Sequence, residues 1–337
     1  MKKQKTLADV AKAAGVSKMT ASRALRGDRN VSKSSLERVR KAATEIGYAG
    51  NHLAANLSGK RSDLIGVVVP SFANIVFAEA LSGITEALAG HRSQPVFGVT
   101  YYDADREYDI IRNMLSWRPS GLIITGLEQT QRTRDLLTRS GIPIVQMMDI
   151  DGDPIDACVG LSHKDAGFDM AEALMGAGRK KFGFIGRNLH QDHRGAKRKA
   201  GFLTALEAKG YGYIATLEED GPTTVDAGRK MTQQLLVQNP DLDCLYYSSD
   251  DMAHGGLCYC IDAGIDVPEQ IALVGFNGLD LINGFPGRIA TSFTARHEIG
   301  KVAARIILKT MDSPNESQDH RKVLINPRID LGLLEPR

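Results

Sequence analysis

The stretch from Thr6 to Gly47 limits the possible folds of this chain more than any other part of the sequence. It predicts short helices, the first of which carries an apolar stripe at helical spacing formed by Leu7, Val10, Ala11 and Ala14. Gly15 can adopt the left-handed conformation that ends a helix, and Ser17 can cap the next one. Because a turn of a few residues forces two helices to cross steeply, the stretch predicts a helix-turn-helix.

The second helix of this unit would present a polar outer face. Its inner stripe consists of Thr20, Ala21, Ala24 and Leu25, and its outer face holds Lys18, Met19, Ser22 and Arg23. A third helix beginning at Ser32 would bury Leu36, Val39, Ala43 and Ile46. Basic and hydroxyl side chains on one exposed helix are the groups that contact bases and phosphates in a DNA groove.

Charge is divided unevenly along the chain. Residues 1–61 hold 14 Lys and Arg against 4 Asp and Glu, a net charge of +10, whereas the remaining residues carry −8. A basic module joined to an acidic body is typical of a phosphate-binding domain. The alternative is a solvated basic bundle that docks on another protein.

Several motifs resemble the lactose-repressor family of bacterial transcription regulators. They include TLADVA from Thr6, GVSKMTASRAL from Gly15, IGY from Ile46, NHLAANL from Asn51 and RSDLIGV from Arg61. The resemblance implies a repressor with a DNA-binding domain at residues 1–48, a double-stranded DNA operator and a core that binds a small effector. Together with the outer face of the second helix, it gives the expected DNA contacts: Thr6, Ser17, Lys18, Met19, Thr20, Ser22, Arg23, Arg26, Asn51 and Leu57.

Residues 49–62 form the predicted linker. Asn51 can cap a short helix, but a helix of seven or eight residues is marginal in water by itself. The resemblance implies a hinge helix that folds on operator DNA and inserts Leu57 into the minor groove. The family usually has proline where this chain has Gly50, which makes the hinge more flexible. The alternative is a plain flexible tether.

Length and composition indicate a multidomain protein without membrane spans. With 337 residues and 42% hydrophobic content, the chain can bury a large core. No apolar run approaches the ~20 residues of a membrane span, and no signal peptide follows the basic N-terminus. We therefore expect a cytoplasmic protein, in which the four cysteines are buried free thiols.

From Leu64 onward, short β-branched strands alternate with helices. This pattern predicts an α/β fold of doubly wound parallel sheets, and its repetition in two series predicts two lobes. The resemblance implies a periplasmic-binding-protein-like core at residues 63–337, in which the chain crosses back near Thr291 to Thr294. Lobe 1 would comprise approximately residues 63–162 and 294–328, and lobe 2 approximately residues 163–293.

Ligands of such sheets bind beyond the carboxyl ends of the strands. Polar residues follow these ends, and apolar side chains could supply a wall of the pocket. The resemblance points to the same places through KRKAGF at Lys197, SSDDMA at Ser248 and VGFN at Val274, and it implies that Arg198 grips the effector. The expected effector contacts are Ser71, Phe72, Phe77, Asp149, Arg198, Ser249, Asp250 and Asn277.

Asn277 indicates the class of effector. Many members of the family that this chain resembles have aspartate there, which suits neutral sugars, whereas asparagine removes a charge that would repel an anion. NMLSW at Asn113 and the SKMT start of the second helix also resemble gluconate-operon repressors. We therefore expect a sugar acid such as gluconate or a keto-gluconate, with a neutral or a phosphorylated sugar as the alternatives.

Enzymes and secreted receptors are the competing classes. No dinucleotide, P-loop, zinc-protease or serine-hydrolase motif is present. The histidines, among them His163, show no metal-ligand spacing and are interpreted as surface or packing residues. No metal, cofactor or enzymatic activity is therefore expected. The C-terminus has no heptad repeat of the kind that joins dimers into tetramers, so we expect a homodimer.

Overall fold

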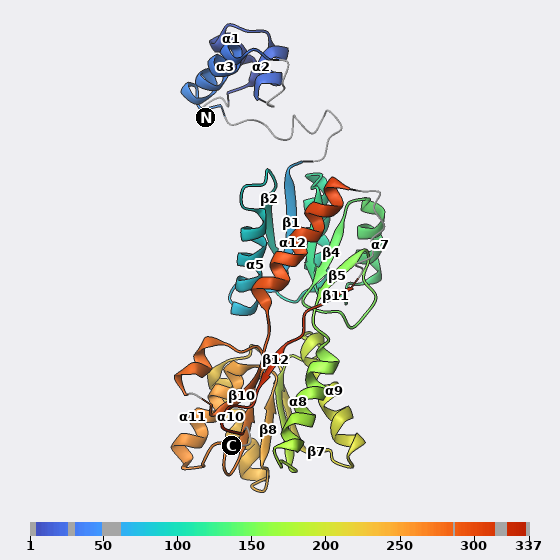
Figure 1. Cartoon of the computed structure of the whole chain (residues 1–337), viewed down its shortest axis with the longest axis vertical. Helices are drawn as coiled ribbons and strands as arrows, with labels where there is room; N and C mark the ends of the chain where they lie inside the picture. The colour runs from blue at the N-terminus through green and yellow to red at the C-terminus, as the bar shows by residue number, and fades with distance from the viewer. Residues whose placement is uncertain (1–4, 26–30, 49–61, 286, 314–321, 335–337) are drawn as a thin grey trace. The chain divides into compact units, whose positions relative to one another are not determined.

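The computed structural model describes residues 5–25, 31–48, 62–285, 287–313 and 322–334 (Figure 1). Two compact units follow one another along the chain, Met1–Ser62 and Asp63–Arg337. Among the described residues, no helix is both long and apolar enough to span a membrane.

The first unit, which we call the head, consists of α1 (Leu7–Ala14), α2 (Lys18–Leu25) and α3 (Lys33–Glu45) in its described part. The predicted turn is present, because Gly15 ends α1 with a φ of 64°. Ala21 and Ala24 of α2 are buried against Val10 and Val39 in one hydrophobic cluster. These small side chains let the helices approach closely, so the predicted helix-turn-helix is confirmed.

The second unit, the core, contains two lobes, each built on one sheet. In the described residues, the first sheet has the strand order β11-β5-β4-β3-β1-β2 and all its strand pairs are parallel. Its strands are β1 (Leu64–Val69), β2 (Gln94–Val99), β3 (Gly121–Thr125), β4 (Ile144–Met147), β5 (Ala157–Gly160) and β11 (Lys322–Leu324), and its helices are α5 (Ile75–Leu88), α6 (Ala104–Ser116), α7 (Gln131–Ser140) and α12 (Arg296–Asp312). Val67 packs with α5 and α12, whereas Val68 packs with α6 and α7. Helices therefore cover both faces, as expected for a doubly wound sheet.

The second sheet has the order β12-β10-β9-β8-β6-β7 and is parallel except for β12, which pairs antiparallel with β10. Its strands are β6 (Phe182–Arg187), β7 (Tyr213–Glu219), β8 (Cys244–Tyr247), β9 (Ala272–Val274), β10 (Ile289–Phe293) and β12 (Arg328–Asp330). The helical elements are α8 (His163–Gly176), α9 (His193–Ala208), α10 (Val225–Gln238), α11 (Asp250–Ala263), η1 (Asp280–Gly284) and η2 (Gly332–Leu334). The predicted α/β class with two parallel-dominated sheets is thus confirmed.

The chain passes between the two lobes at three places. It leaves the first sheet after β5, returns between β10 and α12, and leaves again between β11 and β12. Figure 1 shows these connections as neighbouring chain segments between the two sheets of the core. The last passage, which brings β12 to the second sheet, was not anticipated from the sequence.

Helices α8 and α9 approach each other unusually closely. A Cβ atom added to Gly201 of α9 would lie 2.0 Å from the backbone oxygen of Lys164. A Cβ atom added to Gly167 of α8 would lie 2.1 Å from the backbone oxygen of Arg198. Only glycine fits at either position, so these two residues set the distance between the helices.

The sequence-based boundaries differ from the structure mainly at helix starts. The sequence places the start of α9 at Arg198, whereas the helix begins five residues earlier, at His193. Its first turns were missed because Gly195 is their only buried residue, so they show no apolar period. The elements β5, β10, α12, β11 and β12 were not predicted from the sequence. Short strands such as β11 and β12, with three residues each, offer too little pattern for periodicity.

Candidate functional site

The first candidate site is the exposed face of α2 in the head. The Ser17 hydroxyl accepts a hydrogen bond from the Thr20 backbone N–H at 3.0 Å, so Ser17 caps the helix as predicted. Lys18, Met19 and Arg23 are exposed, and the Met19 side chain is 64% exposed. A single exposed apolar side chain is common on a protein surface, so the two cations are what make this face suited to an anionic partner.

Other head residues differ in their surroundings. Thr6 caps α1 and exchanges hydrogen bonds with Asp9, so its side chain is engaged within the head. Ser22 is half-buried. Leu25 was predicted on the buried stripe but is 38% exposed, because it is the last residue of α2 and lies beyond the cluster around Ala21. Arg26, Asn51 and Leu57, together with the predicted hinge at 49–61, lie outside the described residues.

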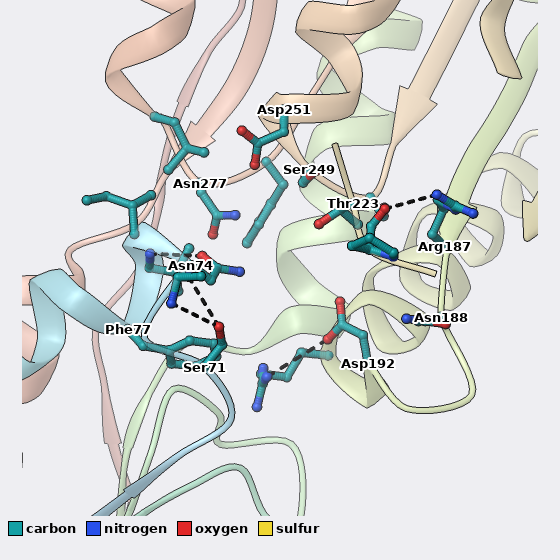
Figure 2. Close-up of a pocket in the computed structure, with 18 of the residues that line it drawn as sticks. Ser71, Asn74, Phe77, Arg187, Asn188, Asp192, Thr223, Ser249, Asp251 and Asn277 are labelled. Carbon is teal, nitrogen blue, oxygen red and sulfur yellow. Dashed lines mark hydrogen bonds and ion pairs between the residues drawn. The ribbon is translucent and has the colours of Figure 1, made fainter. Parts of the chain in front are cut away.

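The second candidate site is a cavity of about 740 Å³ in the core, open at the carboxyl ends of strands from both sheets (Figure 2). Of the expected effector contacts, the following line it: Ser71, Phe77, Arg198, Ser249 and Asn277. Figure 2 shows Asn74 and Asn277 facing the cavity from one side and Asp192 and Thr223 from the other. Phe72, Asp149 and Asp250 do not line the cavity, for three different reasons.

Phe72 lies on the surface instead of the pocket wall. Its side chain is 53% exposed and makes an edge-to-face contact with Phe97, with 6.4 Å between ring centroids. Phe77 alone of the expected aromatic pair lines the pocket, and it is buried.

Asp149 is neutralised by a lysine from the other lobe. Lys197 of α9 places its Nζ 2.6 Å from Asp149 Oδ2 and 2.5 Å from Glu128 Oε1, and it donates to the Asp151 carbonyl at 3.0 Å. Burial raises the pKa of Asp149, and the hydrogen bond from Lys197 opposes this shift. Asp149 therefore contributes to contact between the lobes and is not free to bind effector hydroxyls.

Asp250 holds the loop that follows β9. Its carboxylate accepts hydrogen bonds from the Leu279 backbone N–H at 2.7 Å and from the Thr291 hydroxyl at 2.7 Å. Burial raises the pKa of Asp250 to about 6 despite these bonds. The neighbouring Asp251, rather than Asp250, faces the cavity.

Arg198 is buried at the pocket wall, only 5% exposed. Its Nη2 donates to the Ser248 carbonyl at 2.9 Å, and its guanidinium lies 4.0 Å from the centre of the Phe276 ring. The nearest carboxylate in the described chain is that of Asp192, at 4.0 Å. Since a buried cation normally has a close counter-charge, this guanidinium is suited to an anionic ligand.

Arg194 adds a second positive charge to the same wall, one helical turn from Arg198. Its side chain is 14% exposed, and its ion pair with Asp192 is also 4.0 Å long. One carboxylate thus serves two arginines. The other arginines that line the pocket have closer carboxylates: Arg296 pairs with Glu79 at 2.9 Å, and Arg187 with Glu219 at 3.6 Å.

Asn277 occupies a strained position between the lobes. Its φ is 113°, and its carbonyl accepts hydrogen bonds from the Arg296 guanidinium and from the Thr294 hydroxyl at 3.4 Å. These bonds fix the backbone, so the side-chain amide is directed at the cavity (Figure 2). A strained backbone held by its surroundings is common at ligand sites.

Sequence reasoning missed several residues of the pocket wall. His163, interpreted as a surface or packing residue, is buried and lines the cavity. Tyr102, Asp192 and Arg296 line it as well. Position directly after a strand could have indicated Tyr102, which follows β2, but no local pattern distinguishes His163 or Arg296.

The arrangement is suited to binding a polar molecule. The two arginines with the most distant carboxylates, Arg194 and Arg198, lie on α9, whereas Ser249, Asp251 and Asn277 offer hydrogen-bonding groups elsewhere on the wall. Within the described ranges, no group of three or more His, Cys, Asp or Glu side chains could hold a metal ion. An acid group at the arginines and hydroxyls at the opposite wall would satisfy both parts of the pocket.

Comparison with known proteins extends over nearly the whole chain. Residues 6–51 match the family described as bacterial regulatory proteins, lacI family, and residues 171–332 match the periplasmic binding protein-like domain. The HTH-type transcriptional regulator GntR of Pseudomonas aeruginosa is 40% identical over 305 residues, which cover 90% of this chain and 88% of that protein. The HTH-type transcriptional regulator IdnR of Escherichia coli is 32% identical over 328 residues and 97% of each chain.

A solved structure is similar to this chain over nearly its whole length. The crystal structure of a LacI-family transcriptional regulator from Silicibacter pomeroyi matches with a TM-score of 0.92 and 44% identity, over 97% of this chain and 98% of that one. The head, the two-lobed core and the extent of these similarities confirm the resemblance inferred from the sequence motifs. The chain belongs to the lacI family of bacterial regulatory proteins and is a transcriptional regulator.

Proposed function

We propose that this regulator is a repressor that binds a pseudo-palindromic operator as a homodimer and is controlled by a sugar acid such as gluconate or a keto-gluconate. The observation that carries the proposal is the Arg198 guanidinium, buried in the pocket wall with its nearest carboxylate 4.0 Å away. An effector carboxylate would complete this charge pair. Asn277 stands where many members of the family have an acid, and it adds no negative charge beside that anion.

The exposed face of α2 supports operator binding. Lys18 and Arg23 can donate to base edges and phosphates, and Met19 can contact apolar groups in the groove. The net charge of +10 in residues 1–61 would attract any DNA. Specificity would then depend on the few side chains that reach the bases.

Replacing Arg23 with alanine should separate sequence-specific base contacts from the general attraction of DNA by positive charge. Loss of a base contact should weaken binding to the operator by ~1–3 kcal/mol, whereas binding to random DNA should fall much less. Fluorescence anisotropy with operator and scrambled duplexes at one salt concentration measures both. Equal losses on the two duplexes would show that Arg23 contacts only phosphate.

An exposed apolar face supports the homodimer. Phe72, which precedes α5, and Phe97, on the edge strand β2, are 53% and 40% exposed and contact each other edge to face. Apolar side chains that gather at one edge of a sheet commonly mark a protein interface. A second copy of the chain on this face would supply the second head that a pseudo-palindromic operator requires.

Asn277→Asp tests the acid effector most directly. The substitution adds a negative charge at nearly constant shape, so it should weaken gluconate binding about tenfold or more, which is ~1.4 kcal/mol or more. Binding of glucitol, the neutral polyol of equal length, should change much less. Isothermal titration of both ligands against both proteins gives the comparison.

The other effector classes are separate outcomes of the same titrations. Unchanged or improved gluconate affinity in Asn277→Asp would overturn the acid effector and favour a neutral sugar. Preference of the wild type for 6-phosphogluconate over gluconate would indicate a phosphorylated effector instead.

A further inference from the structure

The His163 ring is held in one tautomer by its two neighbours. His163 is 4% exposed, and its Nε2 lies 2.8 Å from the backbone oxygen of Met148. Because a carbonyl oxygen can only accept, Nε2 must carry the hydrogen. The other ring nitrogen, Nδ1, is then an acceptor and lies 3.1 Å from Nη1 of Arg198.

The electrostatic surroundings keep this ring neutral. Burial lowers the pKa of His163 well below its ordinary value, and the positive charges of Arg198, Arg194 and Lys197 lower it further, whereas the Met148 carbonyl acts in the opposite direction. A protonated ring would present an N–H to the Arg198 guanidinium instead of an acceptor. The hydrogen bond to Arg198 therefore exists only with the neutral ring.

His163 lies where the two lobes meet, so its hydrogen bonds join residues of both. His163 is the first residue of α8 in the second lobe, whereas Met148 follows β4 of the first sheet. The close glycine contact between α8 and α9, at Gly167 and Gly201, brings the ring within reach of Arg198. One side chain thus contacts both the pocket arginine and the backbone of the other lobe.

We propose that His163 is a positioning residue, whose neutral ring orients the Arg198 guanidinium towards the acid group of the effector and connects it to the Met148 carbonyl of the first lobe. The inference rests on the proposed function, since it takes Arg198 as the acid anchor. The Ser248 carbonyl and the Phe276 ring contact Arg198 on other sides, and Phe276 packs in the hydrophobic cluster of the first lobe. His163 differs from both because it joins Arg198 to the first lobe through hydrogen bonds.

Two amide substitutions test the hydrogen bonds of the two ring nitrogens one at a time. In His163→Asn the amide oxygen falls near the position of Nδ1, so the acceptor for Arg198 is kept while the donor to Met148 is lost. In His163→Gln the amide falls near Nε2, so the donor is kept and the acceptor is lost. His91→Asn, on the exposed turn before β2, serves as the control.

Gluconate titrations of the full-length variants test the proposal. His163→Asn and the control should bind gluconate within about threefold of the wild type, whereas His163→Gln should lose about tenfold or more, because a misplaced guanidinium forms weaker charge-assisted bonds. A purely structural role would affect the two amide variants alike. Equal losses in both, at similar thermal stability, would therefore overturn the proposal.

Nitrogen NMR of the histidine ring shows, without any ligand, whether His163 is neutral and protonated on Nε2. From about pH 8 to about pH 5.5, His163 should keep the Nε2-protonated pattern while an exposed histidine titrates near its ordinary pKa of ~6.5. A ring protonated on Nδ1, or one that titrates in this range, would overturn the inference. If the wild type binds no sugar acid, the proposed effector class fails, and the spectrum alone still decides whether His163 is held as described.

Discussion

Replacing Arg198 with alanine is expected to weaken gluconate binding by ~2–5 kcal/mol, the range typical of removing one partner from a buried, hydrogen-bonded charge pair. The loss should be large because the side chain is 5% exposed and water cannot take its place easily. The substitution also leaves the Ser248 carbonyl and the His163 Nδ1 without their donor. Isothermal titration with gluconate measures the change.

The neighbouring residue Lys199 provides a matched control. It lies on the same helix and pairs with Glu218 at the surface, away from the pocket wall. Lys199→Ala should leave gluconate affinity unchanged, and the thermal stability of the two variants shows whether α9 is intact. Gluconate binding by Arg198→Ala within about threefold of the wild type would contradict the role of Arg198 as the anchor.

Replacing Gly201 with alanine should destabilise the second lobe, by up to ~2 kcal/mol net. An added Cβ would lie 2.0 Å from the Lys164 backbone oxygen, so α8 and α9 must separate. Overpacking of this kind costs ~1–3 kcal/mol and occasionally more, which exceeds the ~1 kcal/mol that alanine gains over glycine in a helix. Urea unfolding monitored by circular dichroism gives the free energy of unfolding.

Gly176 offers the comparison at a position without crowding. It is the last residue of α8, and an added Cβ would meet no atom within 4 Å. Gly176→Ala should therefore be neutral or slightly stabilising. If Gly201→Ala unfolds at the same urea concentration as Gly176→Ala, the close approach of the two helices is not required for stability.

The head and the regular parts of the core could be predicted because their signals are local. Gly15 and Ser17 mark a turn and a cap, and strands such as β1 carry apolar residues that are buried on both faces. The crossing after β10 could not be found from periodicity, because it depends on which lobe buries α12. That choice is made by packing of α12 against α5, between segments more than two hundred residues apart.

The pocket was predictable to the extent that it follows the ends of strands. Arg198, Ser249 and Asn277 line it, whereas Asp149 does not, because Lys197 reaches it from the other lobe. A carboxylate at a strand end looks the same in the sequence whether it faces a ligand or a lysine. The role of His163 was missed for the same reason, since both of its partners are distant in the chain.

Lys197 also limits how the two lobes can move. Asp149 is fully buried and pairs with Lys197 of the other lobe, so pulling the lobes apart at this point would break the ion pair. Motions that rotate one lobe about the Lys197 ammonium keep the ion pair, whereas motions that translate it break the pair. We therefore expect the cluster of Lys197, Glu128 and Asp149 to act as a pivot, with displacement that grows with distance from it, towards the outer strands β2 and β7.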